Sequence, residues 1–211
     1  MNKSGQGMMV ILSSPSGAGK TTLTRLLSEK NKNLEISISH TTRVSRKNET
    51  DGRDYYFTNK EEFKKLIDQN SFFEYATVFN NYYGTSKKPA IDKLNKGINI
   101  LLDIDWQGTE QIKKLDLNFK LITFFILPPS TQELKLRLKN REISNTEIVN
   151  ERMSQFKSDI QHWKDYDYVV INEDLDRCYN EINDKINAEK KGIKLDNNTN
   201  KIKKKIDELN V

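Results

Sequence analysis

The chain has 211 residues, of which 35% are hydrophobic and 31% are charged, and its formal net charge is +5. This length predicts one domain with room for small insertions, and a core of modest size. No segment approaches the ~20 consecutive apolar residues that a membrane-spanning helix needs, and the N-terminal apolar run is too short for a secretory signal. The single cysteine, Cys178, excludes an intrachain disulfide, so we expect a cytoplasmic protein that has no membrane partner.

The positive charge is concentrated near the C-terminus. Residues 185–205 contain eight lysines against Glu189 and Asp196, whereas the rest of the chain is close to neutral. A basic tail of this kind can contact RNA or lipid through screened electrostatics. We expect instead that residues 191–211 form a frayed, solvated tail, with Ile202–Leu209 either a short helix or disordered. Nucleic acid is therefore not expected as the main partner.

Strand and helix patterns alternate along the chain, which predicts an α/β fold with a mainly parallel sheet. The expected strands are Met8–Ser13, Ile98–Asp103, Lys120–Leu127 and Tyr168–Ile171. The expected helices are Lys20–Lys30, Lys60–Gln69, Lys87–Leu94, Gly108–Leu115, Thr131–Asn140, Asn145–Trp163 and Leu175–Glu189. Asn59, Ser130 and Ser144 each precede a Glu by three residues, which is the spacing of a helix N-cap.

Two stretches interrupt this alternation. Residues 36–90 are rich in Thr, Tyr, Phe and Arg and predict an inserted β-rich lobe, and residues 131–155 predict a small helical flap. The remaining pieces of the domain over residues 1–190 form its core, at about 1–35, 95–130 and 156–190.

A glycine-rich segment follows the first expected strand. Its residues are Ser14, Pro15, Ser16, Gly17, Ala18, Gly19, Lys20 and Thr21. The two glycines let the backbone curl so that several N–H groups face a phosphate, and the helix that follows adds the positive end of its dipole. Lys20 supplies a charge for the outer phosphates, and the Thr21 hydroxyl can hold Mg²⁺. The segment predicts a P-loop that binds a nucleoside triphosphate, although Ser14 stands where the P-loop pattern begins with Gly.

A second set of residues suits a phosphate and a base. Arg43 and Arg46 lie three apart in a polar, non-helical stretch, so their planar guanidinium groups can bind the oxygens of one polyanion. Further along, tyrosines and Glu74 lie among aromatic residues. Phenol hydroxyls suit a phosphate, an aromatic wall suits a base, and a carboxylate accepts hydrogen bonds from the N–H groups of that base.

Together these segments resemble guanylate kinase, from about Met8 to about Lys185. The resemblance rests on Ser-Pro-Ser-Gly-Ala-Gly-Lys-Thr, Ser-x-Thr-Thr-Arg-x-x-Arg-x-x-Glu-x-Asp-Gly-x-Asp-Tyr-x-Phe, Phe-x-Glu-Tyr-Ala, Tyr-Tyr-Gly-Thr, Asp-Ile-Asp-x-Gln-Gly, Pro-Pro-Ser and Tyr-Asp-Tyr-Val-Val-Ile-Asn, in that order. It implies a P-loop core, a GMP-binding lobe at 36–90 and a lid at 131–155. The chain departs from the family pattern at Ser45, which replaces the usual Pro, and also at His40 and Glu173, to which no role is attached.

The resemblance also implies roles for individual residues. ATP would be bound by residues 14–21 and by Asn172. GMP would be bound by Ser39, Arg43, Arg46, Tyr55, Glu74, Tyr83, Thr85 and Asp103. The catalytic groups would be Lys20, Arg43, Arg137, Arg141 and Arg152. Mg²⁺ would be held by Thr21 with Asp103 or Asp105, directly or through water, and which of the two carboxylates faces the metal stays open.

The implied activity is the Mg²⁺-dependent transfer of the ATP γ-phosphoryl group to GMP or dGMP, giving ADP and GDP, in purine nucleotide metabolism. One alternative is an inactive guanylate-kinase-like scaffold, in which the same arginines and tyrosines bind a phosphopeptide. Another is a kinase for a different nucleoside monophosphate. The residues of the ATP side favour an enzyme over a scaffold, because a scaffold needs none of them. Monomer and homo-oligomer both stay open.

Overall fold

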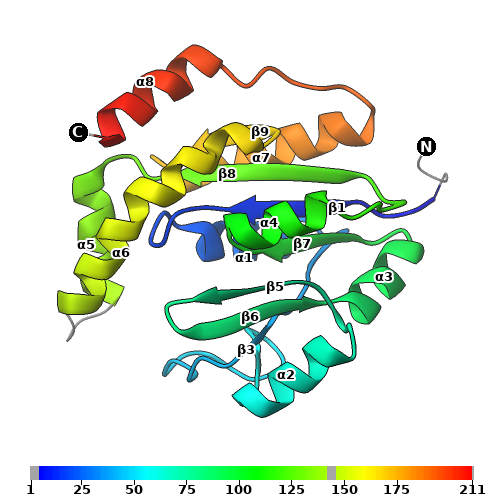
Figure 1. Cartoon of the computed structure of the whole chain (residues 1–211). Helices are drawn as coiled ribbons and strands as arrows, with labels where there is room; N and C mark the ends of the chain where they lie inside the picture. The colour runs from blue at the N-terminus through cyan, green and yellow to red at the C-terminus, as the bar shows by residue number, and fades with distance from the viewer. Residues whose placement is uncertain (1–4, 142–145, 211) are drawn as a thin grey trace. The chain divides into compact units, whose positions relative to one another are not determined.

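The chain folds as an α/β protein around a five-stranded sheet with the strand order β2-β7-β1-β8-β9. The structure is a computed structural model that describes residues 5–141 and 146–210, without the side chain of Arg141. Figure 1 labels the elements. The strands of this sheet are β1 (Met9–Ser13), β2 (Leu34–Ile36), β7 (Asn99–Asp103), β8 (Leu121–Leu127) and β9 (Tyr168–Ile171). The pairs β2–β7 and β8–β9 run parallel, and the predicted α/β class is confirmed.

Strands β1 and β8 are nearly continuous apolar runs rather than alternating patterns. Every residue of β1 is buried, and so is every residue of β8 after its first. A parallel strand covered on both faces requires this composition, because neither face meets water. The four predicted strands correspond to β1, β7, β8 and β9, and their ends agree with the structure to within one residue.

The chain divides into two compact units, and the first comprises Met1–Ile11 and Asn31–Leu121. Besides β2 and β7 it contains a second sheet with the strand order β4-β3-β6-β5. Its other elements are β3 (His40–Thr41), β4 (Tyr56–Phe57), α2 (Lys60–Asp68), β5 (Phe72–Val78), β6 (Asn81–Ser86), α3 (Lys87–Asn95) and α4 (Trp106–Lys113). Its apolar core brings residues of β1, β5 and β7 together with α3 and α4.

Strands β5 and β6 form a tight hairpin. Val78 pairs with Asn81, so only Phe79 and Asn80 form the loop, and both have positive φ, at 47° and 61°. Two successive residues with positive φ are typical of a type I′ turn, whose twist matches that of the strands. The register of this hairpin places Glu74 opposite Thr85.

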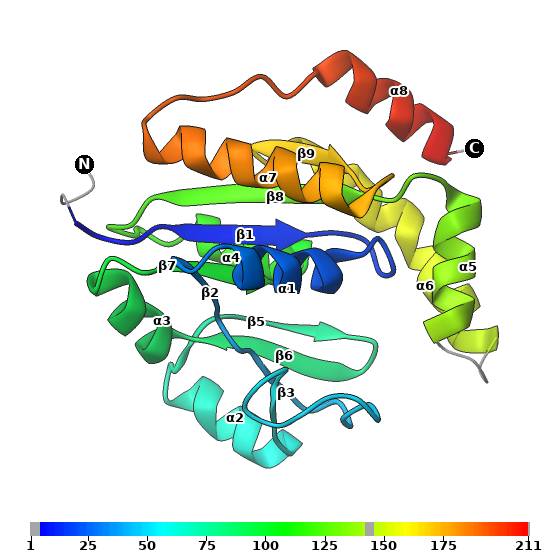
Figure 2. The ribbon, with the colours of Figure 1, turned by 180° about the vertical axis from the view of Figure 1, so that it is seen from behind.

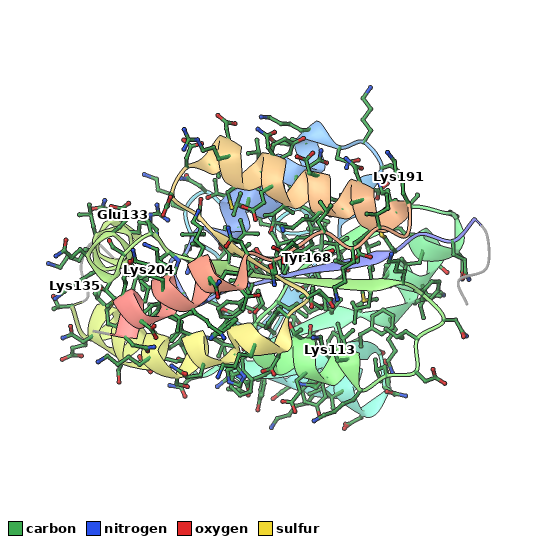
Figure 3. All side chains as sticks on the ribbon, turned by 90° about the horizontal axis from the view of Figure 1, so that it is seen from above. Lys113, Glu133, Lys135, Tyr168, Lys191 and Lys204 are labelled. Carbon is green, nitrogen blue, oxygen red and sulfur yellow. The ribbon has the colours of Figure 1, made fainter. Side chains whose placement is uncertain are left out.

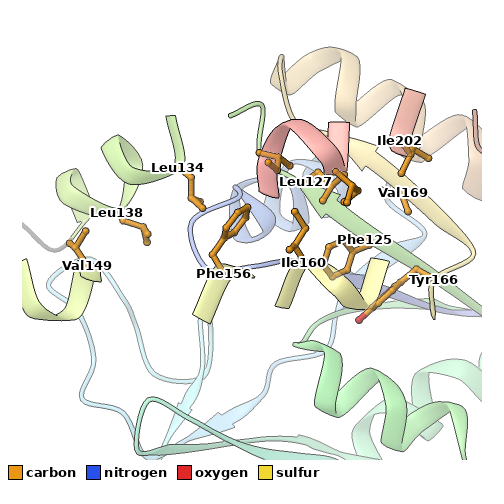
Figure 4. Close-up of a cluster of buried hydrophobic side chains, with 12 residues drawn as sticks. Phe125, Leu127, Leu134, Leu138, Val149, Phe156, Ile160, Tyr166, Val169 and Ile202 are labelled. Carbon is orange, nitrogen blue, oxygen red and sulfur yellow. The ribbon is translucent and has the colours of Figure 1, made fainter. Parts of the chain in front are cut away.

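The second unit comprises Leu12–Lys30 and Ile122–Val211. Its helices are α1 (Lys20–Lys30), α5 (Thr131–Arg141), α6 (Thr146–Asp159), the 3₁₀ segment η1 (Ile160–Asp165), α7 (Leu175–Lys190) and α8 (Thr199–Asn210). Helix α1 lies beside α7 (Figure 2), and Lys30 pairs with Asp176 at 3.3 Å. Figure 4 shows the apolar core of this unit, which joins side chains of β8 and β9 with those of α5, α6, η1 and α8.

Side-chain caps fix several helix starts. The Asn59 Oδ1 accepts a hydrogen bond from Glu62 N at 2.8 Å, and the Ser130 Oγ accepts one from Glu133 N at 3.1 Å. Both predicted caps are confirmed, whereas Ser144 lies outside the described residues. Helix α4 begins at Trp106, two residues before the predicted start at Gly108. The reason is a cap that the pattern did not reveal, in which Asp105 Oδ1 accepts from Gly108 N at 3.0 Å.

The single helix predicted over Asn145–Trp163 is wrong in one respect. Helix α6 ends at Asp159, and the chain continues as the 3₁₀ segment η1. A 3₁₀ turn is tighter than an α-helical turn, and Ile160 at its start is fully buried in the core of the second unit. The change from α-helix to 3₁₀ helix therefore occurs just before the chain enters β9.

The short-helix alternative for Ile202–Leu209 is confirmed, whereas the expectation of a frayed, solvated terminus is wrong. Residues Thr199–Asn210 form α8, and Ile202, Ile206 and Leu209 are buried. Their spacing of four and three residues places them on one helical face. Neither α8 nor any other helix in the described part of the chain has the length and apolar character needed to cross a membrane.

Cys178 lies on α7 and is buried. Burial first, and then the charges of Glu181 and Asp174, raise the pKa of its thiol to about 12. Because the thiolate is the reactive form, we expect Ellman's reagent at pH 8 to label almost none of the native protein. One thiol per chain should react after unfolding in guanidinium chloride. Rapid, complete labelling of the native protein would contradict the burial of this side chain.

Candidate active site

The glycine-rich loop after β1 has the conformation of a phosphate-binding loop. Gly17 and Gly19 have positive φ, at 88° and 99°. The N–H of Ala18 donates to Pro15 O at 3.3 Å and closes the turn, and α1 begins directly afterwards at Lys20. The loop therefore ends at a helix N-terminus, where backbone N–H groups and the helix dipole attract an anion.

Both glycines of this loop also lack room for a side chain. A Cβ on Gly17 would lie 2.9 Å from a methyl carbon of Leu138, and one on Gly19 would overlap the amide nitrogen of Asn172. Ser14, which replaces the usual Gly, donates from Oγ to Pro15 O at 2.9 Å. The serine at this position is therefore accommodated by a hydrogen bond within the loop itself.

Three predicted ATP-side residues contact this loop. Asn172, which is 5% exposed, donates from Nδ2 to Ala18 O at 2.8 Å. Arg137 donates to the same carbonyl at 3.4 Å and also to Glu133 Oε1 at 2.9 Å. Arg152 donates from Nη1 to Ser16 Oγ. For the third predicted arginine, Arg141, the structure gives only its position as the last residue of α5.

In the first unit, a carboxylate that the sequence analysis gave no role holds the two predicted phosphate-binding arginines. Glu49 accepts from Arg43 Nη2 through both oxygens at 2.9 Å and from Arg46 Nη1 at 3.3 Å. It also accepts from the backbone N–H of Arg46 at 2.8 Å. Burial opposes ionisation of Glu49, but the hydrogen bonds from Arg46 and Arg43 outweigh it and lower its pKa.

Two predicted tyrosines lie near this arginine cluster. The rings of Tyr55 and Tyr83 meet edge to face with centroids 6.0 Å apart, and the guanidinium carbon of Arg43 lies 5.4 Å from the Tyr55 ring centroid. Burial first, and then the negative charge of Asp103, raise the pKa of Tyr55 far above its ordinary value. The phenol therefore remains a neutral hydrogen-bond donor at pH 7.

The predicted base-reading residues also lie together. Glu74 on β5 is 3% exposed, and its Oε1 accepts from Thr85 Oγ1 on β6 at 2.6 Å. The Ser39 hydroxyl lies 3.5 Å from the Thr85 hydroxyl. A Cβ on Gly108 would overlap Glu74 Oε2, so the start of α4 approaches this carboxylate closely. A buried carboxylate of this kind can accept hydrogen bonds from adjacent N–H groups of a ligand.

The two predicted metal ligands of the first unit differ in their surroundings. Asp105 uses both carboxylate oxygens to cap α4, accepting from Gly108 N at 3.0 Å and from Gln107 Nε2 at 3.1 Å. Asp103 is the last residue of β7 and is partly exposed. Across residues 5–141 and 146–210, no three His, Cys, Asp or Glu side chains gather into a metal-binding group.

Comparison with known proteins places the chain in a family. The family model described as guanylate kinase matches residues 6–189. A guanylate kinase of Rickettsia bellii is 45% identical over 186 residues, which is 88% of this chain and 96% of that protein. One of Novosphingobium aromaticivorans is 44% identical over 185 residues, which is 88% of this chain and 83% of that protein. This chain belongs to the guanylate kinase family.

A solved guanylate kinase agrees with the fold of this family member. The crystal structure of guanylate kinase from Anaplasma phagocytophilum superposes with a TM-score of 0.74 at 35% sequence identity, covering 88% of this chain and 87% of that one. The fold expected from the resemblance is therefore confirmed.

Two residues that the sequence analysis did not name contact the predicted site residues or their neighbours. Glu49 follows Arg46 by three residues, a spacing at which a carboxylate can reach back to an arginine. Gln111 on α4 donates to Tyr75 O at 2.8 Å and accepts from Tyr75 N at 3.2 Å, beside Glu74. The first had a local signal, whereas the second depends on two elements that are distant in sequence.

Proposed function

We propose that this chain is an ATP:GMP phosphotransferase that transfers the γ-phosphoryl group of ATP to GMP or dGMP. The observation that carries the proposal is the Glu74–Thr85–Ser39 arrangement in a chain that also has a complete phosphate-binding loop. The loop selects a nucleoside triphosphate, and the buried carboxylate selects guanine. A phosphopeptide-binding scaffold is not favoured, because such a protein needs no triphosphate site.

The donor nucleotide binds in the second unit. Backbone N–H groups of residues 16–20 and the N-terminus of α1 hold its phosphates. Lys20 neutralises the outer phosphates, and Arg137 and Arg152 are already held beside the loop by Ala18 and Ser16. We assign Arg141 to the same set, and Asn172 to holding the loop on the adenine side.

The site residues fit a Mg²⁺ ion that arrives with ATP. Mg²⁺ prefers oxygen ligands and is usually bound by one or two protein groups together with substrate phosphates. In the second unit, Thr21 at the start of α1 is exposed and offers a hydroxyl. In the first unit, Asp103 and Asp105 each offer a carboxylate, and Asp105 also caps α4. The ion would supply neutralising charge for the phosphates.

The acceptor binds in the first unit. Arg43 and Arg46 carry planar guanidinium groups that suit the GMP phosphate, and Glu49 fixes their positions before the ligand arrives. Tyr55 and Tyr83 add phenol hydroxyl donors to the same phosphate. Pre-positioning of these groups lowers the entropy lost on binding.

Glu74 determines the choice of base. Guanine presents the adjacent donors N1–H and N2–H₂, and one carboxylate can accept from both. Adenine has no proton on N1, so AMP would leave the buried carboxylate without these partners, which costs ~1–3 kcal/mol for each unsatisfied group. Pockets built to form hydrogen bonds reject such analogues strongly.

The chemical step needs no general base from the protein. An oxygen of the GMP phosphate is already anionic and attacks the γ-phosphorus in line, and the bond from that phosphorus to the β–γ bridging oxygen breaks to release ADP. The protein brings two polyanions together and offsets the charge of the transferring group. These substrates belong to purine nucleotide metabolism, which fits a cytoplasmic enzyme.

A substitution of Glu74 should affect the binding of GMP and ATP differently. For Glu74→Gln, we expect the KM for GMP to rise roughly 10- to 100-fold, as expected for a lost hydrogen bond to a charged group. The KM for ATP should stay within about twofold. Steady-state kinetics with each substrate varied in turn measure both, with Glu61→Gln on the exposed face of α2 as the matched control. An equal rise in both KM values would mean that Glu74 has a structural role only.

The proposed function itself is tested by an acceptor panel. ADP release is followed with GMP, dGMP, AMP, CMP and UMP, each with ATP and Mg²⁺. We expect turnover with GMP and dGMP and little with the other three. Comparable turnover with AMP would assign the chain to another nucleoside monophosphate kinase, and no turnover with any acceptor would favour the scaffold.

A further inference from the structure

The segment that joins α7 to α8 is attached to the edge strand of the sheet. β9 is the last strand in the sheet order, so within residues 5–141 and 146–210 no strand pairs with the other side of its backbone. The Asn197 side chain takes that place, because its Oδ1 accepts from Val169 N at 2.9 Å and its Nδ2 donates to Asp167 O at 3.1 Å. One side chain thus forms the pair of bonds that a neighbouring strand would form.

Buried polar side chains attach the same segment to α7. Lys185 has a side chain that is only 7% exposed, and its Nζ donates to Asp196 O at 3.0 Å. Tyr168 donates from its hydroxyl to Glu189 at 2.7 Å and accepts from Leu195 N at 3.3 Å. Figure 3 labels Lys191, where the chain leaves α7, and Tyr168 next to the returning segment. This attachment fixes the direction in which α8 starts.

Helix α8 then packs into the apolar core of the second unit. Its buried residues belong to the same cluster as side chains of α5, α6 and η1. These residues are Ile202, Ile206 and Leu209 on α8, with Leu134 and Leu138 on α5, and Phe156 and Ile160 (Figure 4). The charged face of α8 points outward, as Lys204 shows in Figure 3.

Polar contacts join α8 to both ends of the α5–α6 pair. Lys205, whose side chain is 17% exposed, donates to Pro129 O at 3.2 Å, just before the cap of α5. At the other end, Gln161 in η1 donates to Asn210 Oδ1 at 3.2 Å. Lys205 also lies 3.9 Å from Glu173, which directly follows the loop-binding residue Asn172. One helix therefore contacts the points where the α5–α6 pair leaves the sheet and returns to it.

The α5–α6 pair presents its arginines to the phosphate-binding loop. Arg137 on α5 contacts Ala18, and Arg152 on α6 contacts Ser16. Leu134 and Leu138 approach Gly17 so closely that a side chain there would touch them. A shift of the α5–α6 pair would therefore move both arginines relative to the bound phosphates.

We propose that α8 is a brace that holds the α5–α6 pair in place, with Lys205 and Ile206 as positioning residues for Arg137 and Arg152. This role rests on the proposed ATP-side function of those arginines. The brace lies beyond residue 189, where the family match ends. The charged tail thus acts on the donor nucleotide through the position of two arginines, without touching the nucleotide itself.

The test uses two variants of the full chain, Ile206→Ala and Lys205→Ala, with Lys204→Ala on the outer face of α8 as the matched control. We expect the Kd for a non-hydrolysable ATP analogue, measured by calorimetry, to rise about 10-fold in both variants, a size typical of coupling between sites. The Kd for GMP should stay within about twofold. Lys205→Arg and Ile206→Val should restore most of the affinity for the analogue.

Amide hydrogen exchange tests the brace without any nucleotide. In both variants, exchange in α5 and α6 should become about 10-fold faster, whereas exchange in α2 should not change. If Ile206→Ala fails to fold, Lys205→Ala decides the matter, because its side chain is at the edge of the core. Unchanged exchange in α5 and α6 of a folded variant, or equal losses of affinity for both nucleotides, would overturn the proposal. If the unaltered chain bound no ATP analogue, the proposed function would fail, and the exchange measurement would still decide whether α8 restrains α5 and α6.

Discussion

Lys20→Ala is expected to lower kcat by about 10²–10³-fold, the effect of removing one pre-positioned group that stabilises transition-state charge. Lys20 is the first residue of α1 and follows Gly19, whose positive φ lets the loop curl. Under the proposed function, its ammonium group neutralises the outer phosphates while negative charge moves from the γ-phosphoryl group to ADP. The loop amides remain in the variant, so the affinity for ATP should fall less than kcat does.

The matched control for this variant is Lys30→Ala at the other end of α1. Lys30 pairs with Asp176 through a side chain that is 47% exposed, so its loss should change kcat by less than about twofold. Both variants should keep the far-ultraviolet circular dichroism spectrum of the unaltered protein. A correctly folded Lys20→Ala protein with full kcat would refute the assignment of this loop as the donor site.

Arg43→Ala is expected to lower kcat/KM for GMP by about 10³-fold, at the lower end of what an arginine contributes to phosphoryl transfer. Two effects combine in this variant. The acceptor phosphate loses a bidentate donor, and Glu49 loses the partner that binds both of its oxygens at 2.9 Å. Because Glu49 is mostly buried and still contacts Arg46, its negative charge is then less offset and repels the incoming phosphate.

Arg43→Lys separates charge from geometry. A lysine keeps the positive charge but cannot bind a phosphate and Glu49 through one planar group, so we expect most of the loss in kcat/KM to remain. Arg53→Ala is the control, because Arg53 is 66% exposed and pairs with its neighbour Asp54. Full activity in Arg43→Lys would show that charge alone suffices, and a large loss in Arg53→Ala would show that the whole segment is sensitive to substitution.

Features fixed by neighbours in sequence could be predicted. The phosphate-binding loop, helix α1 and the caps at Asn59 and Ser130 each depend on residues within a few positions of one another. The central strands were also predictable, because a strand covered on both faces needs an unbroken apolar run. The chemistry of Arg43, Arg46 and Glu74 suggested a phosphate and a base, but only the resemblance assigned all three to one GMP site.

Features fixed by distant contacts could not be predicted. The lysine-rich composition of α8 indicates solvation, and only the core of the second unit explains why Ile202, Ile206 and Leu209 are buried. Which of Asp103 and Asp105 faces the metal was left open, and the capping of α4 by Asp105 is visible only in the structure. The burial of α8 depends on side chains from other helices. The role of Asp105 depends on where α4 begins.

The most direct test of the account is a product analysis of one reaction mixture. The purified chain is incubated with ATP, GMP and Mg²⁺, and the nucleotides are separated by chromatography. We predict that one GDP and one ADP form for each ATP consumed, and that neither forms when GMP is left out. Release of inorganic phosphate with GMP left intact, or no consumption of ATP at all, would contradict the proposal that this chain joins a donor site and a guanine-specific acceptor site in one reaction.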